Sequence, residues 1–202
     1  MNEKDFANYA ATLKKEYIEL FKHRLPIMVG RMAKDHYQEN FRKGGFVNNG
    51  LQKWSVTRRQ QSGSKSASAK YGPLLSKRIH LFSSVKYVPG DYRVKVSNEV
   101  PYAAIHNEGG TINTHPTVTP KMRKMAWARA YAIAGIKVKG KKKLPKELPA
   151  EARKWKALAL TKKAKLDIKA TIPQRRFLGE SAELTKKIND KIEEEVTKIL
   201  KL

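Results

Sequence analysis

The sequence contains no cysteine and comparatively few acidic residues. Without cysteine the 202-residue chain has no disulfide and no thiolate metal ligand, which fits assembly in a reducing compartment. No stretch approaches the run of about eighteen apolar residues that a transmembrane helix needs. The first residues, MNEKDFANYA, mix both charge signs and do not fit a secretory signal peptide. With 40% hydrophobic residues, the chain is long enough for one sizeable core, with or without an appendage.

Basic residues outnumber acidic residues by 43 to 18, which gives a formal net charge of +25. The excess is regional, because residues 121–176 hold 19 Lys and Arg against 3 Asp and Glu. Residues 177–202 are nearly neutral, with 5 basic and 6 acidic residues. A local excess of this size predicts a polyanionic partner, such as a nucleic acid, a membrane surface or an acidic protein. The alternative is a solvated, lysine-rich surface without a specific partner.

The N-terminal region is predicted to be helical. Apolar residues repeat every three or four positions over residues 5–24, and Asp5 is the expected N-cap. Pro26 predicts a break or kink. A second helix is then expected to run to about Phe41 and to end at the glycine pair 44–45.

The C-terminal segment is predicted to be an amphipathic helix from Ser181 to the end of the chain. Its apolar stripe consists of Leu184, Ile188, Ile192, Val196 and Ile199 or Leu200. Such a stripe is typical of a packing face, against either the chain's own sheet or a neighbouring subunit.

Between the terminal helices, residues 46–72 are polar and predict a flexible loop that Trp54 anchors to the body. Residues 73–85 predict a short helix followed by the start of a strand. A turn is expected at residues 88–91.

The most regular alternation, YRVKVS at residues 92–97, predicts a strand that pairs with residues 101–106. Gly109 and Gly110 predict a tight reversal, because glycine adopts positive φ without steric cost.

The lysine-rich region from 111 to 171 is predicted to be mixed in structure. An extended segment at 112–119 leads into a helix at 121–134 and then a basic linker. Residues 151–160 fit either a helix or a strand, and residues 165–172 alternate as a closing strand is expected to.

No catalytic constellation is visible in the sequence. The five histidines show no metal-binding spacing, and neither a phosphate-binding glycine loop nor a nucleophile elbow is present. His106, Asn107 and Glu108 are faintly similar to a nuclease triplet, but the second metal-ligand histidine is missing. A histidine that hydrogen-bonds across the turn is the better interpretation. We therefore expect no catalytic residue, no metal ligand, no cofactor and no enzymatic activity.

Two short motifs are more specific in combination. YAAIHNEGG, at residues 102–110, contains Tyr102, Ala103, Ile105, His106, Gly109 and Gly110. IPQRRFLGE, at residues 172–180, contains Pro173, Arg175, Phe177, Leu178 and Gly179 and directly precedes the last helix. In this order the motifs resemble those of the phage virion morphogenesis family, the Mu-type tail-completion or neck proteins. The resemblance covers roughly residues 25–200, and Arg175 takes the place of the family's motif arginine.

The resemblance implies an α+β fold: a small, mostly antiparallel sheet with N-terminal helices, a lysine-rich insertion and a C-terminal amphipathic helix. The chain is then a single tail-completion-like domain over residues 1–202, with the flexible loop at 46–72 and the basic insertion at 111–171. Arg175 is expected to hydrogen-bond a carboxylate on an adjacent element or subunit.

The implied function is structural, as one subunit of a tail-completion (terminator-like) ring in the neck, at the head–tail connection. The implied partners are copies of the chain in a homo-oligomeric ring, expected to be a hexamer, and other neck and tail proteins, without a membrane. The expected location is the virion neck or tail, after assembly in the host bacterial cytoplasm.

Nonspecific contact with packaged DNA, or with an acidic protein, is expected from the basic segment. The residues are Lys137, Lys139, Lys141, Lys142, Lys143 and Lys146. The alternative function is a free, sequence-nonspecific nucleic-acid-binding protein. The charge supports it, but aromatic residues are not interleaved with the lysine blocks as a stacking platform requires.

Overall fold

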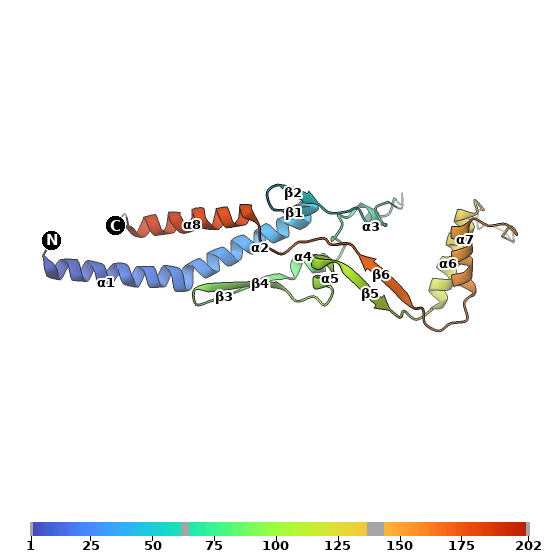
Figure 1. Cartoon of the computed structure of the whole chain (residues 1–202), viewed down its shortest axis with the longest axis horizontal. Helices are drawn as coiled ribbons and strands as arrows, with labels where there is room; N and C mark the ends of the chain where they lie inside the picture. The colour runs from blue at the N-terminus through green and yellow to red at the C-terminus, as the bar shows by residue number, and fades with distance from the viewer. Residues whose placement is uncertain (1, 62–64, 137–143, 201–202) are drawn as a thin grey trace. The chain divides into compact units, whose positions relative to one another are not determined.

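The computed structural model describes residues 2–61, 65–136 and 144–200. The chain divides into two compact units, unit 1 (Met1–Gly110 and Ile172–Leu202) and unit 2 (Thr111–Thr171). Figure 1 shows the elements of both units. The predicted α+β class is confirmed, although the described strands form three separate two-stranded antiparallel sheets and not one small sheet.

Unit 1 begins with helix α1 (Glu3–Glu19). The side chain of Asn2 accepts the main-chain N–H of Asp5 at 2.8 Å, and the carboxylate of Asp5 accepts the N–H of Asn2 at 3.4 Å. This reciprocal arrangement is a capping box, which satisfies two donors at the helix start. The predicted N-cap is therefore wrong: Asn2 is the cap, and Asp5 is the third residue of the helix.

At the break or kink predicted from Pro26, the helix is not broken: a turn of π-helix, η1 (Leu20–Arg24), leads directly into α2 (Leu25–Lys43). Pro26 has no N–H to donate to the carbonyl of Lys22, four residues earlier. That carbonyl instead accepts a long hydrogen bond of 3.5 Å from the N–H of Tyr92. The predicted end of the second helix is confirmed, because Gly44 caps it at φ 67°.

Two hairpins follow α2. Strands β1 (Gly45–Val47) and β2 (Leu51–Lys53) pair inside the segment predicted as a loop. Strands β3 (Val85–Gly90) and β4 (Arg93–Asn98) pair through a two-residue turn.

The second hairpin confirms the strand predicted at 92–97, with a shift of one residue, but its predicted partner and turn are wrong. Pro89 and Gly90 are paired strand residues, and the chain reverses at Asp91 and Tyr92, where Tyr92 adopts φ 57°. Residues 101–106 do not pair with β4, because Ala103–Glu108 forms the short helix α5.

The remaining elements of unit 1 are helices α3 (Ala67–Lys70), α4 (His80–Ser83) and α8 (Ala182–Leu200). The last of these confirms the predicted C-terminal helix. One core cluster consists of Phe41, Trp54, Leu81, Val85, Val100, Ala103 and Phe177. A smaller cluster, Leu20, Leu25 and Ile199, packs α8 against the junction of α1 and α2.

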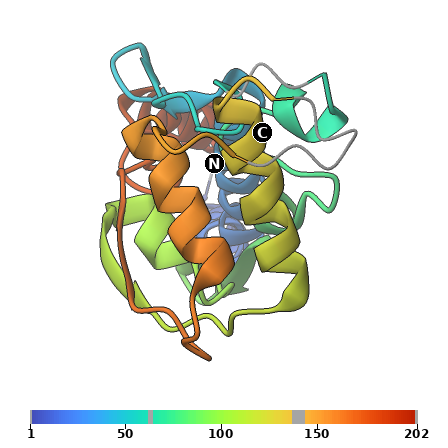
Figure 2. The same ribbon diagram turned by 90° about the vertical axis from the view of Figure 1, so that its right-hand side faces the viewer.

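Unit 2 is a helical hairpin on a β-ribbon. Strands β5 (Gly110–Thr114) and β6 (Ile168–Ile172) form the ribbon, and α6 (Pro120–Ile133) and α7 (Ala150–Leu160) lie side by side. Figure 2 shows the two helices running in opposite directions. Their buried residues are alanines, namely Ala126, Ala130, Ala152 and Ala159, which allow a close approach. The segment at 151–160, which fitted either structure, is helical.

Candidate functional site

The two sequence motifs meet in unit 1. Helix α5 and the extended segment 172–179 are joined by the carbonyl of His106, which accepts the N–H of Arg175 at 2.8 Å. The side-chain oxygen of Asn107 then accepts the N–H groups of Phe177 and Leu178, both at 2.9 Å. One amide side chain thus serves two consecutive donors of the stretch that follows strand β6. We call this contact the motif junction.

Gly109 permits the close approach of the two segments. It adopts φ +73°, and a β-carbon at this position would lie 2.8 Å from the main-chain nitrogen of Gln174. Positive φ is therefore confirmed here and at Gly110, where φ is +135°. The predicted role differs, however, because Gly109 ends α5 and is not part of a turn between two strands.

Phe177 anchors the junction in the core. Its side chain is fully buried, and its ring centroid lies 5.0 Å from that of Phe41 on α2. The carbonyl of Phe177 accepts a hydrogen bond from the side chain of Asn40 at 3.3 Å, and the carbonyl of Gly179 accepts one from the hydroxyl of Tyr37 at 2.8 Å. Helix α2 therefore fixes the second motif through both apolar and polar contacts.

Arg175 is a buried cation with a main-chain partner. Its side chain donates from Nε and Nη2 to the carbonyl of Ser55, at 3.2 and 3.1 Å. Burial, followed by the charge of Arg59, lowers the pKa of the Arg175 guanidinium below its ordinary value. Within the described residues it forms no ion pair with a carboxylate, so its acceptor in this chain differs from the predicted one.

Trp54 completes the junction from the other side. Its indole N–H donates to the carbonyl of Arg176 at 2.9 Å, while its ring packs edge-on against Phe41. Trp54 thus anchors the segment after β2 to the body, as the sequence predicted. The guanidinium of Arg176 is exposed and lies 5.2 Å from the centroid of the Phe46 ring.

His106 contributes its main chain to the junction, but among the described residues its side chain does not form the expected hydrogen bond across the turn. Its Nδ1 atom is buried and has no hydrogen-bond partner among the described residues. Burial, followed by the nearby charge of Arg175, lowers its pKa and favours the neutral ring. Tyr102 packs edge-on against this ring, with the centroids 5.9 Å apart.

Not every predicted residue belongs to the junction. Ala103 is buried in the core and Ile105 is half-buried, whereas Tyr102 and Pro173 are exposed. Five of the predicted polyanion contacts, Lys137, Lys139, Lys141, Lys142 and Lys143, lie outside the described residues. Lys146 is described and exposed.

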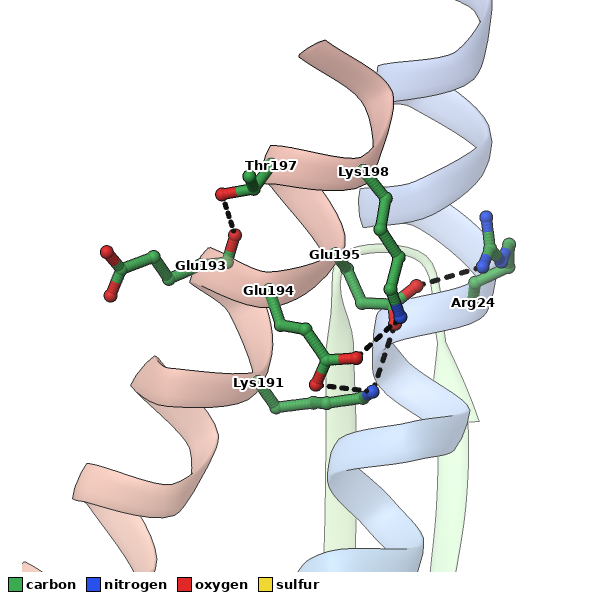
Figure 3. Close-up of polar contacts among 7 residues, drawn as sticks. All are labelled: Arg24, Lys191, Glu193, Glu194, Glu195, Thr197 and Lys198. Atoms are coloured by element: carbon green, nitrogen blue, oxygen red, sulfur yellow. Dashed lines mark hydrogen bonds and ion pairs between the residues drawn. The ribbon is translucent and has the colours of Figure 1, made fainter. Parts of the chain in front are cut away.

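A second polar arrangement, around Glu195 on α8, had no signal in the sequence. Figure 3 shows its carboxylate facing three cations, Arg24 at 3.0 Å, Lys191 at 3.0 Å and Lys198 at 2.7 Å. Hydrogen bonds from Lys198 and Lys191 lower the pKa of Glu195 from 4.5 to about 2. Glu195 is buried and Arg24 belongs to η1, so this pair ties α8 to the helix junction.

Neither arrangement resembles a catalytic centre. Within the part of the chain that the structure describes, no group of three or more His, Cys, Asp or Glu could hold a metal ion. None of the described helices is both long enough and apolar enough to cross a membrane. The junction is built from hydrogen bonds to main-chain groups and from core aromatic rings, which is chemistry that positions a segment.

Comparison with known proteins agrees with the motif evidence. The model of the phage virion morphogenesis family matches residues 22–197, a range that includes the whole motif junction and most of α8. No curated protein and no solved structure shows significant similarity to the chain.

Proposed function

Because the chain belongs to the phage virion morphogenesis family, we propose that it is a structural subunit of the neck of a tailed bacteriophage. In this role it completes the tail as part of a terminator-like ring, so that head and tail can join. The observation that carries the proposal is the family match over residues 22–197, within which the two motifs form one packed junction.

The junction supports a structural role. Its polar groups contact the chain's own main chain, as shown by the two hydrogen bonds that Asn107 accepts and the two that Arg175 donates. A site of this kind holds the segment before α8 at a fixed place. The function we assign to it is to present rigid surfaces to other proteins, without enzymatic activity or a cofactor.

Helix α1 supports assembly with other subunits. None of its residues is buried, and the side chains of Phe6 and Tyr9 are 59% and 41% exposed. Leu13 and Tyr17, further along the helix, pack against the smaller core cluster. An amphipathic helix whose first turns expose apolar side chains is suited to a subunit contact.

The proposed assembly is a homo-oligomeric ring, expected to be a hexamer, that contacts other neck and tail proteins. A ring of identical subunits needs two different complementary surfaces on each copy, repeated until the rotation closes. The proposed location is the neck or tail of the virion, after assembly in the host bacterial cytoplasm.

The oligomeric state of the purified protein tests this proposal. We expect light scattering after size exclusion to show a closed oligomer, and electron microscopy to show a ring. Replacing both Phe6 and Tyr9 by Ser is expected to shift the protein toward the monomer. Replacing Lys4 and Asn8, exposed polar residues of the same helix, should leave the ring unchanged. A protein that stays monomeric at all concentrations and is missing from virions would contradict the proposal.

Phage carrying a disrupted gene provide the matching test in the assembled particle. We expect complete heads and tails that do not join, because the role assigned here is at the connection between them. Joined, infectious particles without the protein would exclude the neck role.

A free, sequence-nonspecific nucleic-acid-binding protein is the second candidate, supported by the net charge of +25. It predicts a monomer that binds nucleic acid at physiological salt and is absent from purified particles. Protein analysis of purified virions therefore separates the two candidates.

A further inference from the structure

Several cations of unit 1 form ion pairs with carboxylates, whereas none of the described Lys and Arg side chains of unit 2 does so with a described residue. On α8, Lys191 and Lys198 each pair with both Glu194 and Glu195 (Figure 3). In unit 2 the only ion pair among the described residues joins His115 to Asp167, at 2.7 Å between Nδ1 and Oδ1. The described Lys and Arg side chains of unit 2 therefore have no carboxylate partner among the described residues.

The packing of unit 2 leaves these cations at its surface. Buried alanines lie between α6 and α7, and most of the Lys and Arg side chains of the two helices are exposed. The exposed cations on the two helices are Lys121, Lys124, Arg129, Arg153 and Lys154. Four more are exposed beyond α7, namely Lys162, Lys163, Lys165 and Lys169.

The helix directions spread the charge along the hairpin. Lys121 and Lys124 lie at the start of α6, and Arg153 and Lys154 at the start of α7, which runs the opposite way (Figure 2). Since Arg129 lies against Trp155, about eight residues of helix lie between the two groups, and with a rise of about 1.5 Å per residue they are separated by roughly 12 Å along the hairpin. Each strand of a DNA duplex carries one phosphate per about 3.4 Å of its axis, so this span covers several phosphates.

The aromatic residues of the hairpin bear on whether it suits single-stranded or double-stranded nucleic acid. Trp127, Tyr131 and Trp155 are half-buried, and the guanidinium of Arg129 lies 6.0 Å from the Trp155 ring centroid. They present no open row of rings on which unpaired bases could stack, as a single-strand site requires. The exposed cations are mainly lysines, which act as hydrated point charges without the planar geometry that arginine uses to read bases.

From these observations we propose that the α6–α7 hairpin of unit 2 binds the phosphate backbone of double-stranded DNA without reading its sequence. Binding needs the free cations of the hairpin and does not depend on a ring or on a place in the virion. An experiment can therefore contradict DNA binding by the hairpin without contradicting the proposed function, and the reverse also holds.

The test measures the affinity of the full-length protein for a short fluorescent duplex across a range of salt concentrations. We expect equal affinity for two unrelated sequences and weaker binding to a single strand of the same length. The informative variant replaces Lys121, Lys124, Arg153 and Lys154 by Gln. The matched control replaces four exposed cations of unit 1 by Gln, namely Lys14, Lys15, Lys77 and Arg78. Both variants therefore lose the same amount of positive charge.

The expected result is a shallower salt dependence for the unit 2 variant only. If all four cations contact phosphates, raising the salt from about 50 to 200 mM should weaken DNA binding by the variant about a hundredfold less than it weakens binding by the unmodified protein. Circular dichroism melting of both variants checks that the fold is intact.

Three outcomes would overturn the proposal. The first is an equal effect of both variants, which would show that net charge alone drives binding. The second is tighter binding to the single strand than to the duplex. The third is competition by polyglutamate as effective as that by duplex DNA, which would identify an acidic polypeptide as the partner.

Discussion

The side-chain oxygen of Asn107 accepts the main-chain N–H of Phe177 at 2.9 Å, across 70 residues of sequence. The same oxygen accepts the N–H of Leu178, so one atom orients the segment that places Phe177 in the core. The two motifs are therefore two halves of one structural contact.

Replacing Asn107 by Ala should destabilise unit 1. Two main-chain donors would lose their acceptor, which we expect to cost about 1–3 kcal/mol in the free energy of unfolding. Asn107→Asp keeps an acceptor oxygen and should cost less. Asn189→Ala, at an exposed position on α8, is the control and should change stability by less than about 0.5 kcal/mol. Urea unfolding measures all three, and equal effects of Asn107→Ala and Asn189→Ala would contradict the role given to Asn107.

Two glycines with nearly the same φ allow the destabilisation caused by backbone strain to be measured apart from that caused by steric contact. Gly109 has φ +73° and a main-chain nitrogen 2.8 Å from the β-carbon position. Gly135 has φ +71° and, apart from its chain neighbours, no atom of a described residue within 4 Å of that position. We expect Gly135→Ala to cost about 1–2 kcal/mol from strain alone. Gly109→Ala should cost more, because the motif junction must also open. Thermal unfolding compares the two variants, and a smaller loss at Gly109 would exclude the close contact.

Arg175 should not tolerate lysine. The guanidinium donates two hydrogen bonds to the carbonyl of Ser55, and an ammonium group cannot reproduce this forked geometry. We expect Arg175→Lys to lower stability by about 1–3 kcal/mol in chemical denaturation. Arg176→Lys, at the exposed neighbouring position, retains the charge near Phe46 and should cost less than about 1 kcal/mol. The reverse order would show that the burial of Arg175 has no energetic role.

Glu195 should contribute to the acid sensitivity of the fold. Its pKa is about 2 in the folded protein against 4.5 for the ordinary group, so the folded state holds this proton less tightly than the unfolded state. The stabilisation is therefore complete above pH 4.5 and is lost as the pH falls toward 2. Glu195→Gln should lower the melting temperature at neutral pH and remove this part of the acid dependence.

The control for Glu195 is its neighbour Glu193, which is exposed and forms no ion pair among the described side chains (Figure 3). Melting curves of Glu193→Gln from pH 7 to 2 should follow those of the unmodified protein. If Glu195→Gln also follows them, the three surrounding cations do not stabilise the folded state.

Periodicity predicted the elements that the structure confirms. The stripe on α8 and the alternation in β4 each extend over enough residues to identify the period. Helix α5 has only six residues, too few for either pattern, and its small apolar residues fitted a strand equally well. The pair Pro89-Gly90 was interpreted as a turn, but a two-stranded ribbon has only edge strands, where proline is tolerated.

Contacts between distant residues were beyond the reach of sequence patterns. The indole of Trp54 bonds a carbonyl 122 residues away, and Arg24 pairs with a carboxylate 171 residues away. The motifs identified residues 102–110 and 172–179 as two parts of a family signature, but they did not predict that the two segments are in contact. Asn107 was noted only as part of a triplet, although its amide is the main polar link between the motifs.

The π turn at Leu20–Arg24 has a geometric consequence for the helix before it. A π turn accommodates one residue more than an α turn, and each residue of a helix advances the chain by about 100° around the axis. Because the wider turn absorbs the extra residue, deleting one residue from this segment would restore regular winding and leave α1 at nearly the same angle around the axis. Phe6 and Tyr9 would keep their direction, so the π turn preserves the orientation of α1 that a regular helix with the same five residues would change by about 100°.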